Sequence, residues 1–97
     1  MNDYTVSESV KIRLKWIVDV LNRFDFDSYT DQQVVELKQV LKAYESIYRD
    51  YPNILLNGLR EEGIDYTDFS LNKVRAARVF VNKYDIKVEE DEKRAKI

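Results

Sequence analysis

The chain of 97 residues is long enough for one domain, and 44% of its residues are hydrophobic, which suffices for a packed core. It carries 16 Lys and Arg against 18 Asp and Glu, a net charge of −2, so it does not offer a global polycation to nucleic acid or membranes. It contains no His and no Cys, which excludes disulfides, zinc sites built on those residues, and Ser-His or Cys-His nucleophile pairs. We therefore expect a non-enzymatic protein without cofactor or metal.

Apolar runs are short, the longest being residues 54–56 and 79–81, far below the roughly 20 residues that span a bilayer. No membrane partner is expected. The N-terminus lacks the basic and apolar regions of a signal peptide, so we expect a cytoplasmic location. Two Gly and one Pro leave few helix breakers, which favours long helices over a β-protein. The preference for Lys, Tyr, Ile and Asn is typical of AT-rich genomes, including those of many phages and plasmids.

Three Tyr-Thr pairs, at residues 4–5, 29–30 and 66–67, each precede a stretch of helical period. Thr is a good N-cap because its hydroxyl accepts a backbone N–H that the first helical turn leaves unpaired. Thr5 is followed three residues later by Glu8, and Thr30 by Gln33, which is the spacing of a capping box. The pairs fit either independent caps or a three-fold repeat. Similarity fades beyond the caps, which favours independent caps.

The first helix is predicted over residues 6–24. One apolar stripe has spacings of three and four and marks a core face: Val10, Leu14, Ile17, Leu21 and Phe24. A second stripe is displaced around the helix and consists of Ile12, Trp16 and Val20. A helix with two apolar faces has two surfaces to bury. The second stripe therefore predicts either an interface with another chain or a central position in the bundle.

The second helix is predicted over residues 31–50, and Pro52 ends it. Its apolar face consists of Val34, Leu37, Leu41, Tyr44, Tyr48 and Tyr51. A short third helix is predicted over residues 53–62, with Asn53 as its cap and Gly63 directly past its end.

The fourth helix is predicted over residues 68–84, with Thr67 as its cap. Its inner face is formed by Leu71, Val74, Ala77, Val81 and Tyr84. The fold class is thus all-α, a compact bundle of four helices within a single domain of residues 1–88. The charged tail of residues 89–97 is either solvated and frayed or an exposed helical extension, since Glu89 and Lys93 stand at i and i+4.

Acidic residues gather in two places that resemble sites. Asp25, Asp27 and Glu36 occupy positions 1, 3 and 12 of a calcium-binding loop, but the position that requires Gly is Thr30. A plain interhelical loop is therefore the better interpretation. The acidic residues within residues 61–68 carry no sign of the burial that raises a carboxyl pKa for acid catalysis.

The third and fourth predicted helices resemble a helix-turn-helix motif, with Gly63 where that motif bends. Residues 69–88 contain five basic residues and one acid, Asp85. In this interpretation the fourth helix contacts DNA through Ser70, Asn72, Lys73, Arg75, Arg78 and Lys83. Acidic residues around the turn count against it, as does Leu59, where the motif has a small residue.

Two hypotheses of function follow. The first is a small helical interaction or regulatory protein that binds another protein, as a homodimer, through Ile12, Trp16 and Val20. The alternative is a helix-turn-helix-like DNA-binding regulator that uses residues 68–84.

Overall fold

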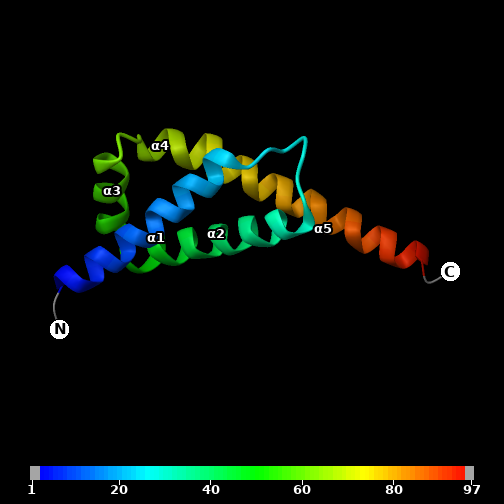
Figure 1. The fold of residues 1–97 in the computed structure, drawn as a ribbon, viewed down its shortest axis with the longest axis horizontal. Coiled ribbons are helices and arrows are strands. Elements are labelled where there is room, and N and C mark those ends of the chain that lie inside the picture. Colours follow the sequence, from blue (N-terminus) through cyan, green and yellow to red (C-terminus); the bar gives the residue numbers. More distant parts are fainter. Residues whose placement is uncertain (1–2, 96–97) are drawn as a thin grey trace.

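The computed structural model describes residues 3–95, and all regular structure among them is helical (Figure 1). Helices α1 (Asp3–Arg23), α2 (Asp31–Asp50) and α3 (Pro52–Glu61) are followed by one long uninterrupted helix. This long helix comprises α4 (Tyr66–Asp68), a π-helical segment η1 (Phe69–Val74) and α5 (Arg75–Ala95). The prediction of an all-α bundle of four helices is confirmed.

The long C-terminal helix runs antiparallel to α2, and α1 crosses both (Figure 1). Side-chain contacts fix this register, since Tyr48 stacks on Tyr66 at one end and the Tyr84 hydroxyl donates to Asp31 at the other. The core between the helices is apolar, and no charged side chain of residues 8–94 is buried. The most deeply buried large side chains are Leu14, Ile17, Leu37, Ile47, Leu55, Leu59, Val34 and Val40. Burial of each such side chain contributes about 1.5–3 kcal/mol.

The start of α2 confirms the capping box predicted at Thr30. The Thr30 hydroxyl accepts from the Gln33 backbone N–H at 3.1 Å, and the Thr30 N–H donates to the Gln33 side chain at 2.8 Å. Two backbone donors that the first turn leaves unpaired are thereby satisfied. The helix begins and ends at the predicted residues.

The start of α3 differs from the prediction. Tyr51 rather than Asn53 occupies the N-cap position, and Pro52 is the first helical residue. Proline is favoured at that position because it has no N–H to leave unpaired and its φ angle already suits a helix.

Helix α3 ends shortly before Gly63, as predicted, and this residue has a φ angle of +74°. The Ile64 N–H donates to the Leu59 carbonyl at 2.9 Å, and the Gly63 N–H to the Arg60 carbonyl at 3.0 Å. These two bonds satisfy carbonyls at the helix end, and Ile64 packs against the core. Glycine is required here because other residues are strained at positive φ.

Two predicted Thr caps are wrong. The helix at α4 is capped by Asp65, whose carboxylate accepts from the Asp68 N–H at 3.0 Å, so Thr67 lies inside the helix. Asp is as good an N-cap as Thr, and its charge also interacts favourably with the helix dipole. Helix α1 begins at Asp3, which places the backbone of Thr5 within the helix. The predicted bond between Thr5 and Glu8 lies outside the part of the chain whose side chains are described.

The segment η1 changes the inner face of the long helix. The Arg75 N–H donates to the Ser70 carbonyl, five residues back, and the buried pair is Phe69 and Val74, each 3% exposed. Leu71, predicted to face inward, is 55% exposed. The prediction assumed 3.6 residues per turn throughout the helix. The π turn contains more residues than an α-helical turn, so Leu71 is rotated away from the core-facing side of the helix. Downstream, Ala77 is fully buried as predicted.

The long helix continues past the predicted domain end. Residues 89–95 are helical and residues 89–94 are exposed, so of the two alternatives for this tail the structure shows a helical extension. Residues 96–97 lie outside the described range. The end of α5 projects from the bundle on the side opposite to the start of α1 (Figure 1), which contributes to extents of 56 × 28 × 19 Å.

Candidate interaction groove between α2 and α5

The three residues predicted as one interface stripe on α1 lie in different environments. Ile12 is 68% exposed, Trp16 is partly buried against the core, and Val20 is 3% exposed. Because a helix turns about 100° per residue, each step of four residues rotates the side chain by about 40° beyond a full turn. Val20 thereby reaches the chain's own core, and the predicted interface at Val20 is corrected accordingly.

The two residues proposed to read DNA bases are engaged within the chain. The Ser70 hydroxyl forms a hydrogen bond of 2.7 Å with the Tyr44 hydroxyl. The Asn72 amide donates to the Asp68 carboxylate. Neither group is presented freely to a base edge.

The four basic residues of the same hypothesis, Lys73, Arg75, Arg78 and Lys83, are all exposed. They do not form one narrow stripe, because Arg78 and Lys83 are about 140° apart around the helix. Arg78 lies beside α2, in a groove that sequence patterns did not identify as a site.

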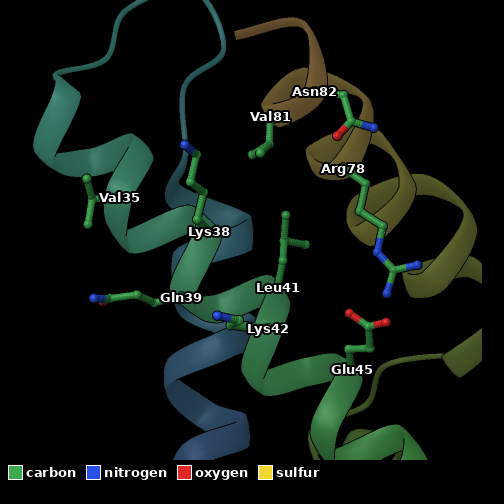
Figure 2. Close-up of a pocket in the computed structure, with 9 residues that line it drawn as sticks. All are labelled: Val35, Lys38, Gln39, Leu41, Lys42, Glu45, Arg78, Val81 and Asn82. Carbon is green, nitrogen blue, oxygen red and sulfur yellow. The ribbon is translucent and has the colours of Figure 1, made fainter. Parts of the chain in front are cut away.

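This surface, termed the α2–α5 groove, consists of three neighbouring hollows that share lining residues. The first is a cavity of about 620 Å³ (Figure 2), lined by Val35, Lys38, Gln39, Leu41, Lys42, Glu45, Arg78, Val81 and Asn82. The second is about 480 Å³, lined by Tyr44, Tyr48, Tyr66, Ser70, Val74, Arg75 and Arg78. The third is about 410 Å³, lined by Tyr48, Arg49, Pro52, Leu56 and Tyr66. The first hollow follows α2 from Val35 to Glu45, about 15 Å at 1.5 Å per residue.

The first hollow has an apolar floor. Leu41 is 8% exposed and Val81 is half-buried, and Figure 2 shows both in the space between the two helices. Val35, at the open side, is 47% exposed. An apolar strip of this kind favours a ligand with apolar side chains of its own.

The rim of the groove is strongly cationic. The three hollows are lined by five basic residues and a single carboxylate, Glu45. Lys38 bonds to Asp85 at 2.5 Å, and Arg49 pairs with Asp50 at 3.2 Å. The remaining cations, Lys42, Arg75 and Arg78, are exposed and form no ion pair within the described residues, although Figure 2 shows Arg78 directed toward Glu45.

Aromatic side chains form the middle of the groove. Tyr48 is 53% exposed and stacks on Tyr66 with ring centroids 6.2 Å apart and planes within 4°. Below them, burial raises the pKa of the Tyr44 hydroxyl above its usual value of 10.0, while the Ser70 hydrogen bond acts in the opposite direction. Tyr44 is therefore neutral at pH 7. Tyr and Arg together are the side chains enriched at protein interfaces.

The acidic loop between α1 and α2 serves a local purpose. The Asp25 carboxylate accepts from the Asp27 N–H at 2.9 Å, a turn-stabilising bond. Within the described residues, no group of three or more acidic side chains is placed to hold a metal ion. Aromatic rings occupy this loop instead, where Phe26 and Tyr29 both pack edge-to-face on Phe80 of α5.

Comparison with family models, with curated proteins and with solved structures found no match to this chain. Among the helices described here, none is both long and apolar enough to cross a bilayer. Sequence reasoning missed the groove, although a signal was present. Lys38, Lys42 and Arg49 recur on α2 at i, i+4 and i+11, a basic stripe next to the apolar face.

Proposed function

We propose that the protein is a non-enzymatic interaction module whose α2–α5 groove binds an acidic, amphipathic segment of a protein partner. The observation that carries this proposal is an apolar-floored groove rimmed by five cations, of which Lys42, Arg75 and Arg78 form no ion pair within the described residues, in a chain whose net charge is −2. Local charge of this kind selects a partner of opposite sign and accelerates its association.

The groove has the features that a docked helix requires. An amphipathic helix places apolar residues at i, i+3 or i+4, and i+7 into a groove of this type. Leu41 and Val81 offer the apolar strip, and Lys42 lies at the edge, where it can pair with a carboxylate of the bound segment. Each such exposed pair contributes about 0.2–1 kcal/mol, so several together set specificity while apolar burial supplies most of the affinity.

Nucleic acid is the competing ligand, because the exposed cations of the long helix also suit phosphates. The start of that helix argues for protein. Asp65 and Asp68 stand at its first turn, where a recognition helix would meet DNA, and both are exposed. Ser70 is committed to Tyr44.

The test measures fluorescence anisotropy of three labelled probes at about 50 and 200 mM salt. The probes are a helical Leu/Glu amphipathic peptide, a scrambled peptide of the same composition, and random duplex DNA. We expect binding of the amphipathic peptide only. The paired substitution Lys42→Glu with Arg78→Glu should weaken it at least tenfold, since two attractive contacts become repulsive.

A charge-matched control, Lys83→Glu with Lys87→Glu, reverses two exposed cations away from the groove. It should leave peptide affinity within about twofold. Equal loss in both variants would show that only net charge matters and would overturn the groove assignment. Binding of DNA in preference to the peptide would refute the protein-docking proposal and favour the hypothesis of a DNA-binding regulator.

A further inference from the structure

The α5 helix extends beyond the helix it packs against. The Tyr84 hydroxyl donates to Asp31, the first residue of α2, at 2.6 Å. Residues 86–95 continue past this point as helix for about 15 Å and project from the bundle (Figure 1). This projecting part of α5 is called the α5 end.

The α5 end has charge on two different faces. Asp85, Val88, Glu89 and Glu92 fall within about 100° of arc, on the same side as Val81. The bases Lys83 and Lys87 lie on the opposite side. Over the described residues 85–94, the first face therefore combines one apolar side chain, 38% exposed, with three carboxylates and no base.

This acidic face already pairs with the groove at its first residue. Asp85 bonds to Lys38 of α2 at 2.5 Å. The next acids on the same face, Glu89 and Glu92, lie beyond the start of α2 and form no ion pair with α2 in the described residues. The acidic face thus extends beyond the part of α2 that supplies it with a cation.

The chain cannot bring its own Glu92 to the free groove cations. Arg78 and Glu92 are 14 residues apart on one continuous helix, which holds them about 21 Å apart. The complementary charges of one chain can meet only on a second chain.

Building on the proposed function, we infer that the groove's partner is a second copy of this chain, with the α5 end of each copy docked in the α2–α5 groove of the other. The exchange is reciprocal, so one two-fold axis closes the assembly as a dimer and doubles the buried area. The α5 end of about 15 Å matches the first hollow, which also runs for about 15 Å along α2, from Val35 to Glu45. Val88 would meet the apolar floor, and Glu89 and Glu92 would meet Lys42 and Arg78.

Sedimentation equilibrium of the full chain, at about 1–100 µM and at two salt concentrations, tests this inference. We expect a mass twice the 11.6 kDa of the single chain, with weaker association at higher salt. The end variant, Glu89→Lys with Glu92→Lys, should weaken dimerisation at least tenfold. The groove variant, Lys42→Glu with Arg78→Glu, should do the same.

The decisive measurement mixes these two variants. In the mixture each end variant's α5 end again faces a groove of opposite charge, so a heterodimer should form at concentrations at which each variant alone is mostly monomeric. A charge-matched control, Glu62→Lys with Glu90→Lys, alters two exposed acids off the acidic face and should dimerise like the unmodified chain. Circular dichroism of every variant checks that helix content is retained.

Three results would overturn the inference. They are a monomer at 100 µM, a dimer that both reversals leave intact, and a mixture that stays monomeric. The peptide assay separates this failure from that of the proposed function. If the protein is monomeric but still binds the acidic amphipathic peptide, only the homodimer inference is refuted, and the groove remains a docking site for another protein. If the protein is monomeric and does not bind the peptide, both the homodimer inference and the proposed function are refuted.

Discussion

Replacing Tyr44 by Phe removes the hydroxyl that connects α2 to the π-helical segment. Tyr44 is 3% exposed, and its hydroxyl lies 2.7 Å from that of Ser70, which is partly buried. A hydrogen bond of this kind contributes about 1 kcal/mol net. Tyr44→Phe should therefore lower the free energy of unfolding by about 1 kcal/mol.

Ser70→Ala breaks the same bond from the other side but leaves the buried Tyr44 hydroxyl without a partner. That desolvated group costs about 1–3 kcal/mol, partly offset by the roughly 0.5 kcal/mol better helix propensity of Ala. We expect a net loss of about 1–2 kcal/mol. The double variant removes both polar groups, so its loss should be about 1 kcal/mol less than the sum of the single losses.

Urea unfolding followed by Trp16 fluorescence measures all four proteins, since Trp16 is the sole Trp and packs partly buried against the core. A difference of 1 kcal/mol moves the midpoint by about 0.5–1 M for typical urea slopes. Additive single losses would refute the reasoning, because they would mean that the two hydroxyls do not depend on each other in solution.

Other substitutions test the local structure. Thr30→Ala removes the α2 cap and Asp65→Ala the α4 cap, so each should lower the free energy of unfolding by about 1 kcal/mol. Thr67→Ala, inside the helix, should change it by less than about 0.5 kcal/mol. Thermal unfolding compares the three variants. Gly63→Ala should cost about 1 kcal/mol through its φ of +74° alone, since no atom lies within 4 Å of the added Cβ; a loss under 0.3 kcal/mol in urea would contradict this. Burial raises the pKa of Tyr44 in the folded state, so the contribution of its neutral form to stability should be intact below pH 10 and be lost as the pH rises further. Melting temperatures recorded from pH 9 to 11 should therefore fall, and they should fall less steeply in Tyr44→Phe.

Features that depend on local chemistry were predictable from the sequence. The start of α2 follows from the Thr30 capping box, its end from Pro52, and the end of α3 from Gly63, because in each case a few adjacent residues determine the backbone geometry. Where two adjacent cap residues compete, the sequence does not decide between them. Asp65 and Thr67 are both good caps, and the structure uses the one that starts the helix two residues earlier.

Helix phase was predictable where the α-helical period is regular, as at Val10, Leu14 and Ile17, but not around η1. The inward position assigned to Leu71 failed because η1 departs from the α-helical period, and no residue type within it signals a π turn. Of the second apolar stripe, Val20 lies in the core because a strict spacing of four drifts around α1, which agrees with the alternative of a central position at that residue. The groove needs the antiparallel register of α2 and α5, which brings Lys42 and Arg78 to one surface although they are distant in the sequence.

The π turn at η1 also determines which length changes the protein tolerates. Deletion of one residue between Ser70 and Lys73 would leave a sequence able to continue as ordinary α-helix, so helix content would hardly change. Because the π turn accommodates one residue more than an α-helical turn, the deletion would leave the downstream residues close to their present phase, with Phe69 and Val74 four positions apart on one face and Ala77 still directed to the core. In evolutionary terms, homologues should tolerate the loss of one residue between Phe69 and Val74, whereas a one-residue insertion or deletion within α5 would rotate everything after it by about 100°.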